Sequence, residues 1–179
     1  SKMLAVVKAN AYGHGAPIIA TALQSQVDAL GVACLEEALE LRDCGVTSPV
    51  LLLEGVFEET EISTAAQLGL WVTIGNEQQL KWLEDAKLTT PLHCWLKVDT
   101  GMNRLGVAPK QAGDCHRRLT ASVNATTHIV TYTHFATADD VTSQKTRDQI
   151  ARFDALSLDA LRSAANSAGV LAWPQAHYE

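Results

Sequence analysis

Short apolar runs alternate with amphipathic helical patterns along the whole chain, and this alternation restricts the possible folds more than any other feature. The apolar runs that indicate strands lie at residues 3–7, 29–33, 50–53, 70–74, 92–98, 127–134 and 162–166. The segments with apolar residues at three- and four-residue spacing lie at 17–26, 35–42, 58–68, 77–86, 109–119 and 144–161. Such alternation predicts an α/β fold in which parallel strands are joined by helical crossovers.

Two folds fit this order of elements: an open doubly wound sheet and a closed (β/α)8 barrel. No G-x-G-x-x-G motif follows the first apolar run, and polar residues recur at the carboxyl ends of several predicted strands, where a barrel places its active site. We therefore expect a (β/α)8 TIM-type barrel. A complete barrel takes about 250 residues, so the 179 residues, with about seven strands, are expected to form one partial barrel domain. The start at Ser1, directly before a strand, also indicates truncation, and we expect the isolated chain to be unstable.

Composition favours a small-molecule partner. Twenty acidic and fourteen basic residues give a net charge of -6, which opposes binding to nucleic acid or to an anionic membrane. No apolar stretch is long enough to span a bilayer. The cysteines are far apart and form no C-x-x-C pair, so we expect reduced thiols and a cytoplasmic protein; they are Cys34, Cys44, Cys94 and Cys115. The histidines show no metal-ligand spacing, and no metal site is predicted.

The segment AVVKANAYGHG, residues 5–15, places Lys8 at the end of a strand that should be covered on both faces, directly before a glycine-flanked turn. Burying an ammonium group is costly unless its charge is paired or removed. Desolvation favours the neutral amine, which is a competent nucleophile toward a carbonyl compound such as pyridoxal phosphate. Position alone leaves open a second interpretation, in which the head of Lys8 reaches solvent.

Several motifs occur in the order found in one enzyme family. They are AVVKANAYGHG, GVACLEEALELR, LLLEG, LKVDTGMNRLG, THFATADD, AANSAG and WPQAHYE. With these motifs the chain resembles the alanine racemases over nearly its whole length. The resemblance implies a barrel that binds pyridoxal 5'-phosphate and interconverts L-alanine and D-alanine. It further implies a cytoplasmic homodimer that supplies D-alanine for the peptidoglycan of the bacterial cell wall.

The resemblance also assigns roles to residues near the cofactor. Lys8 would form the internal aldimine and exchange the substrate α-proton on one face, and Tyr12 would donate its hydroxyl to the cofactor phosphate. Asn166 and Ser167 end the last predicted strand, and a polar pair before a helix N-terminus suits a phosphate. Ser167 would bind the phosphate by resemblance. The pair could equally cap the helix, which is compatible with binding.

Three residues of the later strands complete the expected site. Arg104 carries a planar, permanently charged guanidinium, which suits a phenolic oxygen or a carboxylate. By resemblance it contacts the ring oxygen of the cofactor and orients the substrate carboxylate; the alternative is pairing with Asp99 or solvent. His134 would stack beside the pyridine ring, and Lys8, Arg104 and His134 are the expected catalytic residues. Lys97 should approach Arg104, and it either is carbamylated, as in some family members, or points elsewhere.

Two parts implied by the resemblance have no counterpart in residues 1–179. One is a tyrosine from the β-rich C-terminal domain of the partner subunit, which acts as the second base. The other is an arginine facing the ring nitrogen, expected just beyond WPQAHYE, so we expect the chain to be inactive alone. Two alternative functions remain. One is a non-catalytic barrel that stores or delivers pyridoxal phosphate, which the AYGHG and GMNRLG extensions disfavour. The other is a racemase of broader specificity acting on serine or other amino acids.

Overall fold

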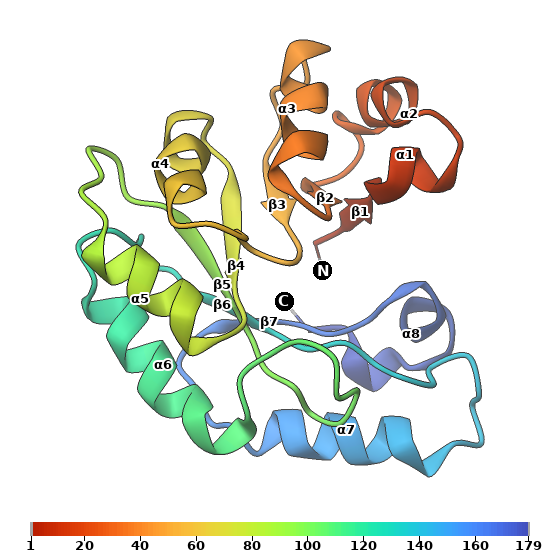
Figure 1. The fold of residues 1–179 in the computed structure, drawn as a ribbon. Coiled ribbons are helices and arrows are strands. Elements are labelled where there is room, and N and C mark those ends of the chain that lie inside the picture. The colour runs from red at the N-terminus through yellow and green to blue at the C-terminus, as the bar shows by residue number, and fades with distance from the viewer. Residues whose placement is uncertain (1, 179) are drawn as a thin grey trace.

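Seven parallel strands form one sheet in the computed structural model, which describes residues 2–178. The strands pair in chain order, and Figure 1 shows them surrounded by the helices. They are β1 (Leu4–Val6), β2 (Ala29–Val32), β3 (Val50–Leu52), β4 (Trp71–Ile74), β5 (His93–Lys97), β6 (Val130–Tyr132) and β7 (Leu161–Ser163). The predicted α/β barrel architecture, incomplete in this chain, is confirmed.

The helices follow the strands as predicted, with two additions. They are α1 (Lys8–Tyr12), α2 (Ala16–Leu23), α3 (Leu35–Asp43), α4 (Thr60–Gln67), α5 (Glu77–Asp85), α6 (Pro109–Ala121), α7 (Gln144–Asp154) and α8 (Ser167–Ala172), followed by a 3-10 turn (Pro174–Ala176). The additions are α1, in which residues 9–11 have left-handed dihedral angles, and α8. No helix within residues 2–178 has the length and apolar character needed to cross a membrane.

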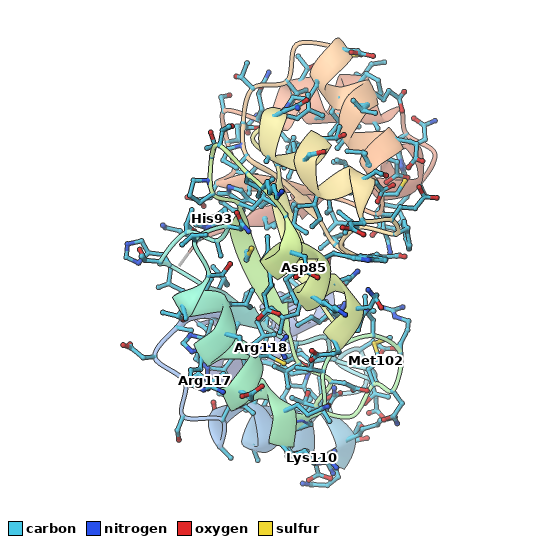
Figure 2. All side chains as sticks on the ribbon, turned by 60° about the vertical axis from the view of Figure 1, so that its left-hand side comes forward. Asp85, His93, Met102, Lys110, Arg117 and Arg118 are labelled. Carbon is cyan, nitrogen blue, oxygen red and sulfur yellow. The ribbon has the colours of Figure 1, made fainter. Side chains whose placement is uncertain are left out.

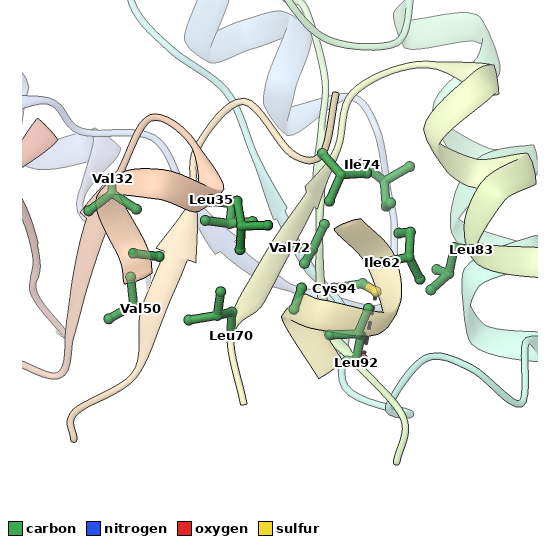
Figure 3. Close-up of a cluster of buried hydrophobic side chains, with 14 of the residues drawn as sticks. Val32, Leu35, Val50, Ile62, Leu70, Val72, Ile74, Leu83, Leu92 and Cys94 are labelled. Atoms are coloured by element: carbon green, nitrogen blue, oxygen red, sulfur yellow. Dashed lines mark hydrogen bonds between the residues drawn. The ribbon is translucent and has the colours of Figure 1, made fainter. Parts of the chain in front are cut away.

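Alternation along each strand divides its side chains between two environments. Outward-facing residues pack against the helices in the largest core cluster, which Figure 3 shows around Val72, Cys94 and Ile62. Inward-facing residues form a smaller cluster that includes Leu51, Trp95, Val130 and Tyr132. The helices therefore cover the outer face of the sheet, while aromatic and aliphatic side chains fill the interior of the curved sheet.

Local sequence explains where some of the helices begin and how they pair. The side chain of Asn76 accepts the N–H of Gln79 at 2.9 Å and caps α5. Arg118 of α6 binds Glu77 and Glu84 of α5 at 2.8 and 2.7 Å, and Figure 2 labels it where these helices lie together. These ion pairs are partly exposed, so they orient the helices more than they stabilise them.

The predicted ends of four elements are wrong by three or more residues. The helix expected over 17–26 ends at Leu23, and the strand expected over 127–134 occupies Val130–Tyr132. The helix expected over 144–161 ends at Asp154, and Ser157 adopts a left-handed φ of 48° where the chain turns before β7. Leu156 and Leu158 continue the helical spacing but pack against the core from this turn. The strand expected over 162–166 occupies Leu161–Ser163 instead. All four cysteines are free, in agreement with the expected thiols.

The two outer strands of the sheet have exposed edges. Within residues 2–178, β1 pairs only with β2 and β7 only with β6. The expectation that β1 is covered on both faces is wrong, because Leu4 and Ala5 are only partly buried and Val6 is 36% exposed. Leu161 on β7 is 50% exposed. Unpaired strand edges with apolar side chains promote association between chains.

We expect residues 1–179, expressed alone, to self-associate through these edges. Leu161→Lys should raise the monomer fraction, because a charge on an edge strand opposes pairing with another chain. Sedimentation velocity at several concentrations measures this fraction. The control is Val123→Lys, at an 87% exposed residue outside the strands, which should change nothing. A wild-type chain that stays monomeric throughout would contradict the prediction.

Candidate functional site

One cavity of about 560 Å³ opens at the carboxyl ends of the strands. In Figure 2, the label His93 lies at the start of β5 and the label Met102 lies in the loop that follows this strand. The structure brings five of the predicted site residues to the cavity wall, and they are Lys8, Tyr12, Lys97, Arg104 and His134. A cavity of this size at this end of the strands is suited to a cofactor or small ligand.

Lys8 follows β1 and is succeeded by a left-handed turn, which is the unusual backbone feature of the site. Ala9, Asn10 and Ala11 have φ of 51–54° and ψ of 45–51°, and Tyr12 has φ of 55°. Each such non-glycine residue costs about 1–2 kcal/mol relative to the right-handed conformation. The Asn10 side chain accepts the N–H of Ala16 at 2.8 Å and ties the turn to α2. The turn lets Tyr12 line the same cavity as Lys8.

Lys97 is buried and faces the same cavity from β5. Its register partner is Tyr132, whose ring centroid lies 5.1 Å from Lys97 Nζ. Within residues 2–178 its ammonium group has no ion pair or hydrogen bond. Burial lowers the pKa of Lys97 to about 8, and repulsion from Arg104 and Lys8 adds to this effect. An appreciable fraction of the Lys97 amine is therefore neutral near physiological pH.

Arg104 lies in a loop whose shape is set by other residues. Asp99 Oδ1 accepts the N–H groups of Gly101, Met102 and Asn103 at 2.9–3.0 Å. The aspartate thus organises the loop and does not pair with Arg104. Arg104 is exposed to solvent at the cavity wall, as the other part of that alternative states. Among the described residues the Arg104 guanidinium has no hydrogen-bond partner, which leaves it available to an anion.

A glycine closes this loop against β5. Gly106 has φ of 130°, and a Cβ at this position would lie 2.7 Å from Asp99 N. The close approach allows Val107 N–H to donate to Lys97 O and Asp99 N–H to donate to Val107 O, both at 2.9 Å. These bonds hold the Arg104 loop beside Lys97.

His134 follows β6 and is half-buried at the cavity wall. Burial lowers the pKa of His134 to about 4, and the charges of Lys97, Arg104 and Lys8 add to this effect. Gln149 of α7 donates from Nε2 to His134 O at 2.9 Å and fixes the backbone at this point. The imidazole is therefore neutral at pH 7, and it can stack on a ring or share one hydrogen bond without carrying charge.

Sequence reasoning gave no site role to Tyr132 and Glu54, which also line the cavity. Tyr132 donates its hydroxyl hydrogen to Leu53 O at 3.0 Å or to Thr73 Oγ1 at 2.8 Å, and burial raises its pKa. The alternation that points Lys97 inward also points Tyr132 inward, so this residue could have been found from the strand period. Glu54 follows β3 in the LLLEG segment and is the one acidic residue among the described residues of the cavity wall.

Asn166 and Ser167 do not belong to the described cavity wall. Asn166 Oδ1 accepts the N–H of Gly169 at 2.9 Å and caps α8. This agrees with the alternative interpretation of the pair as a helix cap. Ser167 is exposed. Residues 2–178 contain no group of three or more histidine, cysteine or acidic side chains arranged for a metal ion.

The electrostatics of the cavity contrast with those of the chain. Lys8, Lys97 and Arg104 face one cavity, although the net charge is -6. Such a concentration of cations in a partly desolvated site is suited to an anionic ligand, because an anion relieves their repulsion. The fold and the site together define an α/β barrel protein whose cavity wall carries two lysines and an arginine, a lining suited to an anionic ligand.

The comparison with known proteins identifies the family. Residues 1–179 match the family model "Alanine racemase, N-terminal domain". The chain is 49% identical over 178 residues to the catabolic alanine racemase of Pseudomonas putida and 46% identical over 181 residues to the biosynthetic alanine racemase of Escherichia coli. These alignments cover 98% and 100% of this chain. The chain therefore belongs to the alanine racemase family, which confirms the resemblance found in the sequence.

The structural comparison agrees with this assignment. The biosynthetic alanine racemase of Pseudomonas aeruginosa superposes with a TM-score of 0.94 at 43% identity, over 99% of this chain and 50% of that one. The racemase of Acinetobacter baumannii gives 0.91 at 36% identity, over 100% of this chain and 51% of that one. The chain spans about half the length of the curated relatives it matches, 50% in the two named above.

We expect His134 to stay neutral in the ligand-free chain until the pH falls to about 4. Its ring proton resonances, assigned with His134→Asn, should not shift between pH 8 and pH 5. Because the pKa is lower in the folded than in the unfolded chain, unfolding takes up a proton between about pH 6.5 and 4. Stability should therefore fall as the pH decreases through this window, and less so in His134→Asn. A ring titration near pH 6.5 would contradict this assignment.

Proposed function

We propose that this chain forms the cofactor-binding half of an enzyme that interconverts L-alanine and D-alanine with pyridoxal 5'-phosphate. The observation that carries the proposal is the meeting of Lys8 with Lys97 and Arg104 around one cavity in an acidic chain. The relatives named above, which are alanine racemases, support the choice of substrate.

The residues present fit pyridoxal phosphate. The volume of about 560 Å³ lies in the range typical of small-ligand sites. The amine of Lys8 suits the aldehyde, and the cations suit the phosphate and the substrate carboxylate. When bound, the cofactor would supply an electron sink for the charge that develops at the substrate Cα.

Each of these residues would then have a separate role in binding or proton transfer. Lys8 Nζ holds the cofactor aldehyde and, once released, takes or returns the Cα proton on one face. Arg104 orients the substrate carboxylate, and Tyr12 donates its hydroxyl to the phosphate. His134 supports the ring as a neutral imidazole. Ser167 and Asn166 would contribute to phosphate binding from the start of α8.

Racemisation needs a second proton donor on the opposite face, because the proton must return from the other side of Cα. We assign this role to a residue outside residues 1–179, supplied by a partner subunit in a homodimer. The product would serve peptidoglycan synthesis in the cytoplasm. Assaying the full gene product that contains this chain with both enantiomers of alanine and of serine tests the reaction and its specificity. Failure to racemise alanine would overturn the proposal, and racemisation of serine as well would show the broader specificity.

Lys97 is proposed to be carbamylated in the working enzyme. Its neutral amine would attack carbon dioxide, form an N–C bond and release one proton, which leaves a carbamate anion. The low pKa of Lys97, about 8, provides the neutral amine. The modification would replace a cation by an anion next to Arg104, so that repulsion becomes attraction.

We expect Lys8→Ala in the full gene product to abolish the visible absorbance of covalently bound pyridoxal phosphate, because the nucleophilic amine is removed. Borohydride reduction followed by peptide mapping should place the pyridoxyl group on Lys8 in the wild type. Lys110→Ala is the control, since Lys110 is exposed at the start of α6. A pyridoxyl group on another lysine would show that the site assignment is wrong.

Carbamylation of Lys97 predicts that activity falls when carbon dioxide is removed and recovers with bicarbonate. Carbon-13 bicarbonate should give a carbamate resonance that is absent in Lys97→Met. The fall should be larger at pH 7 than at pH 9, because the neutral amine becomes more abundant above a pKa of about 8. An unmodified Lys97, together with activity that is insensitive to carbon dioxide, would refute the modification.

A further inference from the structure

The left-handed turn after Lys8 is held by a carboxylate from another part of the barrel. Glu37 lies in the first turn of α3, the helix that follows β2. Its Oε1 accepts the N–H of Ala9 at 2.8 Å, and its Oε2 accepts the N–H of Ala33 at 2.7 Å. One side chain therefore joins the turn after β1 to the loop after β2.

Gln79 makes a corresponding contact between the loops after β3 and β4. Gln79 of α5 accepts the N–H of Gly75 at 2.8 Å in the loop after β4. Its Nε2 donates to Glu54 O at 2.9 Å and to Val56 O at 3.0 Å, in the segment after β3. This side chain joins a donor to acceptors, and an amide supplies both functions.

Gln149 of α7 makes the same kind of contact between the loops after β5 and β6. Its Oε1 accepts the N–H of Ala136 at 2.9 Å after β6. Its Nε2 donates to Thr100 Oγ1 at 3.3 Å after β5 and also to His134 O. In all three cases the side chain comes from the helix that follows β2, β4 or β6. It joins the loop before that helix to the loop after the preceding strand.

The chemistry of the first case differs from that of the other two. Glu37 meets two N–H donors, from Ala9 and Ala33. An amide has only one acceptor oxygen and would turn its NH₂ group toward one of these donors. Only a carboxylate offers two acceptor oxygens, and bonds to an ionised acceptor are the stronger ones. The position thus requires glutamate rather than its isosteric amide.

We propose that Glu37 is a positioning residue that holds Lys8 at the cavity for covalent attachment of the cofactor. Ala9 directly follows Lys8 and is the first residue of the left-handed turn, with φ of 51°. The bond from its N–H to the Glu37 carboxylate offsets the conformational cost at this point. Without it the turn relaxes, and the Cα of Lys8 shifts relative to the cavity. The inference rests on the proposed function only where it concerns the cofactor.

The first test needs no cofactor. In the full gene product, Glu37→Gln should raise hydrogen exchange of the amides of residues 9–13 by about tenfold or more, because a charged hydrogen bond is lost. Exchange in α7 should stay unchanged. Glu40→Gln is the matched control, since Glu40 is an exposed residue of the same helix and loses the same charge. Unchanged exchange in Glu37→Gln would overturn the inference even if the proposed function were correct.

The second test separates the placement of Lys8 from binding in general. Pyridoxal phosphate can attach to Lys8, whereas pyridoxamine phosphate has the same phosphate and ring but no aldehyde. Glu37→Gln should weaken pyridoxal phosphate binding by about tenfold and leave pyridoxamine phosphate binding unchanged. Equal weakening of both ligands would indicate general destabilisation and overturn the positioning role. If wild type binds neither ligand, the proposed function fails, and the exchange test alone decides on Glu37.

A compensating substitution provides a further criterion. Ala9→Gly removes the Cβ that penalises the left-handed conformation. In the Glu37→Gln background it should recover most of the slow exchange of residues 9–13 and of the pyridoxal phosphate affinity. No recovery in a variant with wild-type melting temperature would contradict the role assigned to the carboxylate in stabilising this turn.

Discussion

Parallel pairing of the strands in chain order is the constraint from which the site follows. Because all seven strands run in one direction, their carboxyl ends lie along one rim of the sheet. Residues separated by more than a hundred positions in sequence, such as Lys8 and His134, therefore reach the same cavity. The apolar contacts between the sheet and the outer helices supply the stability that this arrangement needs.

The same convergence creates an electrostatic cost. Lys8, Lys97 and Arg104 repel one another across the cavity. Burial is the main cause of the lowered pKa values of Lys97 and His134, and this repulsion adds to it. Glu54 opposes it only in part, since a single acidic residue faces three cations in the described wall. An anion in the cavity would relieve the repulsion in the folded chain alone, so its binding would also stabilise the fold.

The sequence predicted those features that depend on periodicity or on motif position. The alternation of apolar runs identified every strand of the described sheet. The inner strands β2 to β6 are largely buried and apolar, as expected of parallel strands, whereas β1 and β7 are partly exposed. Helix ends were less predictable: Leu156 and Leu158 keep helical spacing while lying in a turn. The left-handed turn could not be derived from Ala9 and Ala11, whose intrinsic preference is right-handed. It depends on partners distant in sequence, and residue propensities do not report such partners.

The three side chains that join neighbouring loops show how these non-local contacts shape the site. Each comes from a helix packed outside the sheet and fixes loops at the carboxyl ends of the strands, and Gln79 also lines the cavity itself. The donors and acceptors that each side chain meets determine its chemistry. Gln79 and Gln149 bridge mixed partners, whereas Glu37 bridges two N–H groups. A substitution that preserves size but changes this match, such as glutamate to glutamine, is therefore not conservative at position 37.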